Sequence, residues 1–116
     1  MIHQKKGKKF GRKRGQRRAF LKGLIGNLIK IGKITTTEIR AKETRSQTEK
    51  LLSLAKKQNV ASLRILISRI GKTPAQKLFY EIAPKYLDRK GGYIRIIKLS
   101  KKRKGDASQM AVAEFV

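Results

Sequence analysis

The side chains of this chain that could do chemistry are overwhelmingly cationic. The sequence contains 31 Lys and Arg residues against 7 Asp and Glu, which gives a formal net charge of +24 at pH 7. Such a chain repels itself unless a dense anion lies beside it, and a nucleic-acid duplex carries a phosphate charge about every 1.7 Å of its axis. The composition therefore indicates a nucleic-acid-binding protein, and the alternatives are a membrane surface or a purely solubilising role.

The first cationic segment covers residues 1–18 and contains no Asp or Glu. It has too few apolar side chains to offset the entropy of ordering, so we expect it to be flexible alone and to order only against phosphates. The alternative is a solubilising tail. The residues expected to bind RNA in this segment and in the helix after it are His3, Lys5, Lys6, Lys8, Lys9, Arg12, Lys13, Arg14, Arg17, Arg18 and Lys22.

The second cationic segment covers residues 85–104 and surrounds a predicted strand at 93–99. The paired glycines before this strand can adopt positive φ or admit a close backbone, which other residues do at higher cost. After the strand, a basic loop leads into a second apolar run at 110–116, and we expect a long-looped hairpin. The residues expected to bind RNA here are Lys85, Arg89, Lys90, Gly91, Gly92, Tyr93, Arg95, Lys98, Lys101, Lys102, Arg103 and Lys104.

Two interpretations stay open within this segment. Tyr86 and Tyr93, like Phe10 in the first segment, could stack on unpaired bases, or the two tyrosines could belong to the core. Arg95 could reach a phosphate from an otherwise apolar strand, or it could pair with Asp88 or Glu114. The sequence shows no base-specific pattern, so we expect recognition by shape and phosphate position.

Catalytic residues are not evident in this sequence. His3 is the one histidine, it has no neighbouring Ser, Cys or paired carboxylate, and the chain contains no cysteine. The acids are scattered and have Lys or Arg nearby on the predicted helices. We therefore expect no enzyme activity, no metal, no cofactor and no small-molecule substrate. No secretory signal and no run of roughly 20 apolar residues is present, so we expect a soluble intracellular protein.

The apolar periodicity predicts the elements that position these cations. We expect helices at about residues 19–31, 38–57, 60–70 and 73–83, and strands at 34–37, 93–99 and 110–116. Gly32 is the expected stop of the first helix. The residues of the second helix expected to point inward are Ala41, Thr44, Thr48, Leu51, Leu52 and Ala55. A capping box of Thr35 with Glu38 is the expected start of the second helix, with Thr36 or Thr37 as the alternative cap. A Thr73 cap before Pro74 is the expected start of the fourth helix, and Pro84 its expected stop. The fold class is α+β, two-layer, in the order α-β-α-α-α-β-β. One compact domain at 19–116 follows the basic extension at 1–18.

Several ordered motifs resemble the bacterial large-subunit ribosomal protein 17 family over nearly the whole chain. They are Met1–Arg12, Ile34–Thr36, Lys50–Lys56, Lys77–Phe79, Ile82–Tyr86, Arg89–Ile96 and Gly105–Ala111. The resemblance implies a mixed three-stranded sheet, binding to large-subunit ribosomal RNA, and a place near the polypeptide exit region beside other ribosomal proteins. Ile2 and Gln4 stand where the family usually has Arg, which removes two of its tail cations.

The expected function is thus a structural constituent of the large ribosomal subunit. The alternative is a free basic nucleic-acid-binding protein of the nucleoid or RNA-chaperone type. A membrane-active helix at 19–31 is a third interpretation. The expected location is the cytoplasmic ribosome, with an organellar ribosome as the alternative.

Overall fold

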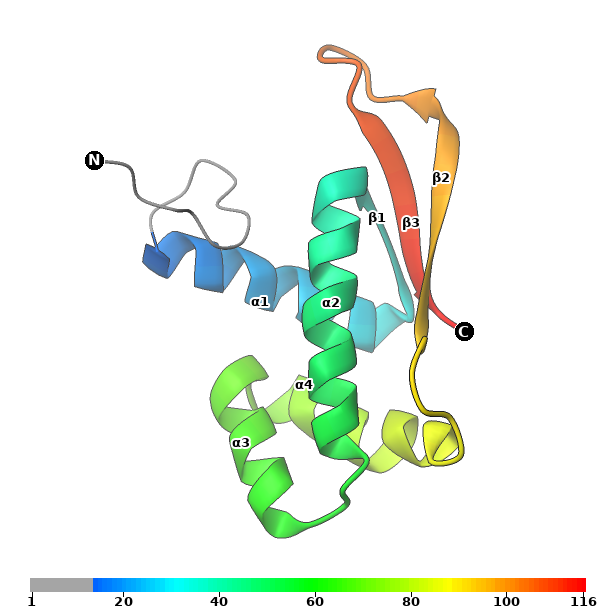
Figure 1. Ribbon diagram of the computed structural model, residues 1–116. Coiled ribbons are helices and arrows are strands. Elements are labelled where there is room, and N and C mark those ends of the chain that lie inside the picture. The colour runs from blue at the N-terminus through cyan, green and yellow to red at the C-terminus, as the bar shows by residue number, and fades with distance from the viewer. Residues whose placement is uncertain (1–13) are drawn as a thin grey trace, which may run out of the picture.

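The computed structural model describes residues 14–116, in which helices lie on one face of a small sheet (Figure 1). This α+β order matches the predicted one. The long elements are α1 (Arg14–Ile31), β1 (Lys33–Thr37), α2 (Glu38–Ala55), α3 (Val60–Ile70), β2 (Ile94–Lys102) and β3 (Gln109–Phe115). A run of short helices, α4 (Lys72–Lys77), η1 (Leu78–Ile82) and η2 (Ala83–Tyr86), connects α3 to the turn before β2.

The sheet has the strand order β1-β3-β2, and both pairs are antiparallel. The expectation of a mixed sheet is therefore wrong in this detail. The helices between β1 and β2 return the chain so that both edge strands run in the same direction, but β3 lies between them and pairs with each. No two parallel strands are neighbours within residues 14–116, so no parallel ladder forms there.

Helix α2 packs across one face of the sheet (Figure 1). Its buried residues are the ones predicted to point inward: Ala41, Thr44, Thr48, Leu51, Leu52 and Ala55. On the facing strand β3, Ala111 and Ala113 are fully buried. Small side chains at both surfaces let the helix approach the central strand closely, and the flanking Ile34, Ile94 and Ile96 close the sides of this core.

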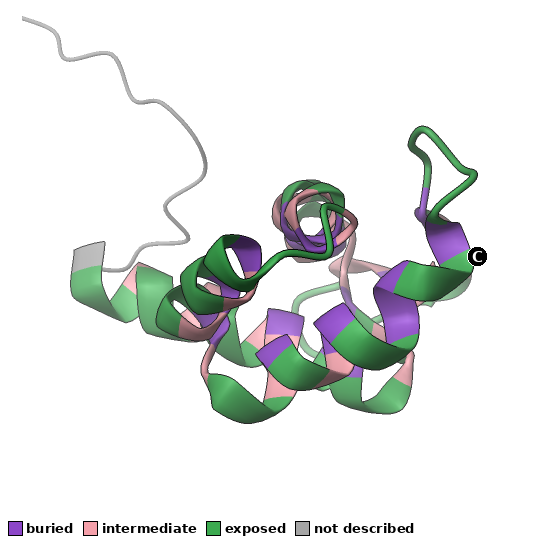
Figure 2. Ribbon diagram, turned by 90° about the horizontal axis from the view of Figure 1, so that it is seen from below, coloured by how far each residue is buried: buried purple, intermediate pink, exposed green. Residues whose placement is uncertain are grey.

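Helices α1, α3, α4 and η1 form the rest of the helical layer. In Figure 2 their buried parts face one another while the exposed parts face outward. Leu28, Leu66 and Leu78 are fully buried at the centre of this cluster. Helix α1 ends at Ile31, just before the predicted stop at Gly32, whose φ of +100° is a left-handed conformation that favours glycine.

Helix α1 begins at Arg14 and so runs through the predicted boundary between residues 18 and 19. Arg and Gln are good helix formers, so the helix extends into the basic segment despite Gly15 and without an apolar stripe there. That residues 1–18 act as one RNA-binding unit stays a prediction.

The start of α2 follows one of the predicted alternatives, and two other predicted helix ends were wrong. The N-cap of α2 is Thr37, without a side-chain cap hydrogen bond, while Thr35 belongs to β1 and forms no capping box. Helix α4 begins after Gly71 (φ +92°), so Thr73 lies inside it. Pro84 does not end the helical run. It lies in the first turn of η2, where a backbone N–H is not needed for a helical hydrogen bond.

Candidate nucleic-acid interface

The β2–β3 hairpin projects past the N-terminal end of α2, so its tip stands clear of the helical layer (Figure 1). Strand β2 continues to Lys102 through an irregular register after Lys98, and residues 103–108 form the connection. Lys101, Lys102 and Lys104 are exposed there, and none has an ion-pair partner within residues 14–116. The predicted basic loop is therefore an exposed cationic projection.

Within this tip, Arg103 forms an ion pair with Asp106. The Arg103 guanidinium donates to both carboxylate oxygens of Asp106, with Nε 3.1 Å from Oδ1. The Ser108 backbone N–H also donates to Oδ1, at 3.2 Å. These hydrogen bonds, that from Arg103 first, hold the pKa of Asp106 far below its ordinary value of 3.8. Arg103 thus shapes the loop, and its charge is partly neutralised there.

Two further cations of β2 have acidic partners. Arg95 Nε lies 3.2 Å from Glu114 Oε1 on the neighbouring strand, so the structural pairing considered for Arg95 exists, although 59% of its side chain is exposed. Lys98 Nζ lies 3.3 Å from Glu38 Oε2 at the start of α2. Hydrogen bonds from Lys42 and then Lys98 lower the pKa of Glu38 below its ordinary 4.5. These pairs tie β2 to β3 and to α2.

The turn before β2 carries exposed cations and the paired glycines. Lys85, Arg89 and Lys90 are exposed. Gly92 has φ of +64°, so its conformation favours glycine, as predicted. A Cβ built on Gly91 or Gly92 would meet nothing within 4 Å among the described residues, so of the two predicted roles the positive φ is the one observed.

The two tyrosines of this segment belong to the core. Tyr93 is 2% exposed and Tyr86 is 8% exposed, and their rings pack edge to face with centroids 5.5 Å apart. The Tyr86 hydroxyl donates to the Val116 carbonyl at 2.6 Å, and burial raises the pKa of Tyr86 above 10.0. The stacking interpretation is therefore wrong for these rings, because neither has a free face for a base. Phe10 lies outside the described residues.

Of the first cationic segment, the structure describes only its C-terminal end. Arg18 and Lys22 are exposed on α1, and Arg17 is half-buried. The backbone of Arg14 starts this helix. The remaining predicted residues lie outside the described part of the chain: His3, Lys5, Lys6, Lys8, Lys9, Arg12 and Lys13.

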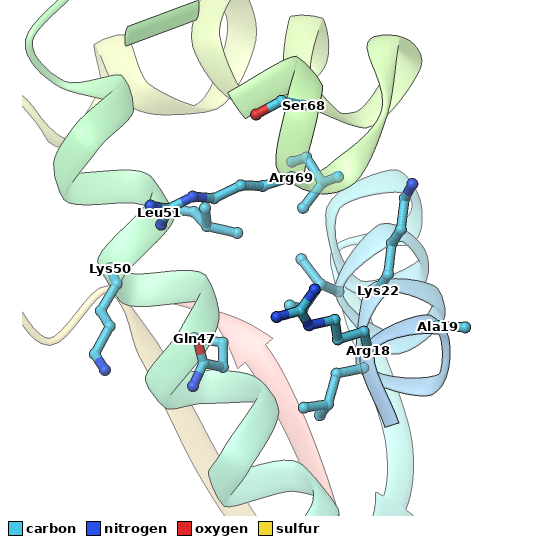
Figure 3. Close-up of a pocket in the computed structure, with 11 residues that line it drawn as sticks. Arg18, Ala19, Lys22, Gln47, Lys50, Leu51, Ser68 and Arg69 are labelled. Atoms are coloured by element: carbon cyan, nitrogen blue, oxygen red, sulfur yellow. The ribbon is translucent and has the colours of Figure 1, made fainter. Parts of the chain in front are cut away.

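Arg18 and Lys22 also line an open groove of about 670 Å³ between α1, α2 and α3, which we call the three-helix groove (Figure 3). It brings them together with Lys50 of α2 and Arg69 of α3, which were not among the residues predicted to bind RNA. The sequence carries a partial signal for these two, as exposed cations on predicted helices. Only packing shows that they share a groove with α1.

Residues 14–116 contain neither a membrane-spanning helix nor a cluster of metal-binding side chains. No helix within residues 14–116 is long and apolar enough to cross a bilayer. Over the same range, no three His, Asp or Glu side chains come together in an arrangement that could hold a metal ion.

Comparison with known proteins gives the family. A family model described as ribosomal protein L17 matches residues 20–116, which is most of the chain. The chain belongs to the ribosomal protein L17 family. This confirms the resemblance seen in the motifs, and since the family consists of ribosomal structural proteins, it also confirms that the chain is not an enzyme.

Relatives within the L17 family cover the chain almost end to end. The large ribosomal subunit protein bL17 of Persephonella marina is 49% identical over 118 aligned positions, which span 100% of this chain and 95% of the relative. The bL17 proteins of Thermoanaerobacter sp. strain X514 and Clostridium botulinum strain Hall are each 46% identical and span 94% of this chain. These alignments cover 97% and 96% of the two relatives.

Proposed function

We propose that this chain is a structural constituent of the large ribosomal subunit that binds and stabilises folded large-subunit ribosomal RNA through phosphate contacts. The relatives are named as large-subunit proteins. The observation that carries the proposal is the cationic hairpin tip, where Lys101, Lys102 and Lys104 project without acidic partners in the described structure. Exposed cations held away from the protein's own acids are available to displace counterions from RNA.

In this proposal the protein recognises the shape of the RNA backbone and not the base sequence. The aromatic rings of the second cationic segment are buried, and its exposed polar groups are mainly ammonium and guanidinium ions, together with the Gly91–Gly92 backbone. Such groups contact phosphate oxygens, which position a protein on RNA without reading sequence. The residues at 1–18 are the second half of the proposed contact surface.

The proposed site of action is the cytoplasmic ribosome, or an organellar ribosome, near the polypeptide exit region and beside other large-subunit proteins. This placement rests on the family resemblance. The proposed ligand is ribosomal RNA, with no cofactor and no small-molecule substrate. Mapping RNA crosslinks of the hairpin in assembled subunits tests the placement, since crosslinks far from the exit region would contradict it.

Deletion of residues 2–13 tests the role of the first cationic segment. The deletion stops before α1, so the circular dichroism and the melting temperature of the described domain should change little. The slope of log affinity against log salt for RNA binding should flatten by about 0.7–0.9 for each phosphate that the shortened chain no longer neutralises. An unchanged slope would contradict phosphate binding by this segment.

A full-length variant separates the effect of the lost charge on RNA binding from the effect of the shorter chain. Changing Lys5, Lys6, Lys8 and Lys9 to Gln should flatten the salt slope in the same direction as the deletion. The triple change of Lys101, Lys102 and Lys104 to Gln tests the hairpin by the same measurement. Sedimentation of a lysate at moderate salt then separates the proposal from the alternative, since a free nucleic-acid-binding protein would not co-migrate stably with large subunits.

A further inference from the structure

The three-helix groove combines an apolar floor with cationic walls. Ile25 of α1, Leu51 of α2 and Ile70 of α3 are the most buried of its lining residues, each about 5% exposed or less. Figure 3 shows the guanidinium groups of Arg18 and Arg69 extending from α1 and α3 toward the side of the groove that faces α2. The surface thus offers hydrophobic contact and positive charge in one place.

No acidic side chain lines the three-helix groove within the described part of the chain. Its polar members are the cations Arg18, Lys22, Lys50 and Arg69 together with the neutral Gln47 and Ser68. All seven acids of the chain lie between residues 38 and 114, where the structure describes them, and Glu38, Asp106 and Glu114 pair with cations elsewhere. The positive charge of the groove is therefore not neutralised from within it, and an anionic occupant is favoured.

We propose that the three-helix groove receives one unpaired nucleotide of RNA, with its base on the apolar floor and its phosphates against Arg18 and Arg69. This inference rests on the proposed RNA-binding function and adds a site to it. An extruded base needs an apolar or planar surface, and a guanidinium supplies both a stacking plane and a fork of donors for phosphate. The groove volume lies in the range of pockets that hold small organic ligands.

Other occupants fit less well. A continuous RNA duplex keeps its bases stacked inside and presents phosphates across a wide surface, so it would leave the apolar floor empty. The chain's own residues 1–13 contain cations and no acid, so they would be repelled by the four cations of the groove. An acidic peptide could satisfy those cations, and its binding is one outcome of the test.

The test uses the full chain and two RNA hairpins of equal length and charge, one fully paired and one with a single bulged nucleotide. We expect the bulged RNA to bind several-fold more tightly. The methyl resonances of Ile25, Leu51 and Ile70 should shift with the bulged RNA and stay in place with the paired RNA. The double variant Arg18→Gln, Arg69→Gln should lose the preference for the bulge while keeping most of its affinity for the paired hairpin.

The matched control is the double variant Arg64→Gln, Lys72→Gln. It removes two exposed cations that do not line the groove, so it should weaken both RNAs alike and keep the preference. Equal binding of the two RNAs by the unaltered chain would overturn the groove proposal and leave the proposed function standing. Failure to bind either RNA would contradict the proposed function itself. Methyl shifts caused by an acidic peptide, and not by bulged RNA, would assign the groove to a protein partner and also overturn the proposal.

Discussion

Lys56 and Tyr93 join the end of α2 to the turn that leads into β2. The Lys56 ammonium donates to the Tyr93 hydroxyl at 2.7 Å and lies 4.8 Å from the centre of the same ring. It also donates to the Arg89 carbonyl, to which the Tyr93 hydroxyl donates at 3.1 Å. One lysine therefore supports a turn whose own cations point to solvent.

Replacing Lys56 with Met should lower the free energy of unfolding by about 1–3 kcal/mol. The methionine keeps the apolar stem but removes the charge-assisted hydrogen bonds and the cation over the ring face. Urea unfolding measures the change. Lys57→Met removes the same charge from the next, exposed residue and should stay within about 0.5 kcal/mol of the unaltered chain. Equal stability of the two variants would contradict this role of Lys56.

Gly92→Ala should cost about 1–2 kcal/mol of stability, while Gly91→Ala should be nearly neutral. A Cβ at either position has free space, but only Gly92 has a positive φ, so the whole cost at Gly92 comes from backbone conformation. Gly92→Asn should cost less than Gly92→Ala, because Asn tolerates this region better. Thermal melts of the three variants measure the differences, and equal losses at both glycines would refute the conformational argument.

Thr44 and Thr48 are fully buried on the same face of α2, and their hydroxyl groups differ in one respect. The Thr44 hydroxyl donates to the Arg40 carbonyl at 2.8 Å, whereas the Thr48 hydroxyl has no partner among the described residues. Thr48→Val should therefore be neutral or stabilising, and Thr44→Val should be less stable than Thr48→Val by about 1 kcal/mol. Chemical denaturation measures both variants. A greater loss at Thr48 would indicate that its hydroxyl is hydrogen-bonded in solution.

The loop at Asp106 should be sensitive to acid only at very low pH. Because the folded pKa is depressed, the Arg103 pair stabilises the loop above the unfolded pKa of about 3.8, and this stabilisation is lost as the pH falls through the folded pKa. A carboxyl-carbon NMR titration should place the midpoint of Asp106 well below the ordinary aspartate value of 3.8. In Arg103→Gln the Asp106 midpoint should rise toward 3.8, and an unmoved midpoint would contradict the pairing.

A charge swap separates the two roles of Arg95. Arg95→Glu sets two carboxylates side by side and should cost less than about 1 kcal/mol, because the side chain at position 95 is largely exposed to solvent. Adding Glu114→Arg restores opposite charges and the net charge, so the melting temperature should recover. If Arg95 contacts phosphate, as proposed, RNA binding should remain weakened in the swapped chain. Recovery of both properties would make Arg95 a purely structural partner of Glu114.

The sequence by itself determined the helices, the strands and the helix face that packs on the sheet. Every residue predicted to point inward from α2 is buried. A helix has a period of 3.6 residues, so the residues that repeat at this spacing lie on one face, and that face packs against the sheet. The positive φ at Gly92 was likewise predictable from the paired glycines before a strand. These features depend on residues that are close to one another along the chain, so the sequence pattern indicates them directly.

Only the tertiary structure decided how the cations and aromatic rings are used. The sequence could not tell whether Tyr93 would meet a base or the core, because a tyrosine ring is suited to both and packing against Tyr86 settles it. It left Arg95 without a unique partner until the strand register placed Glu114 opposite it. Lys50 and Arg69 share one groove with Arg18 because three successive helices pack together, and contact between helices leaves no periodic signal in any one of them.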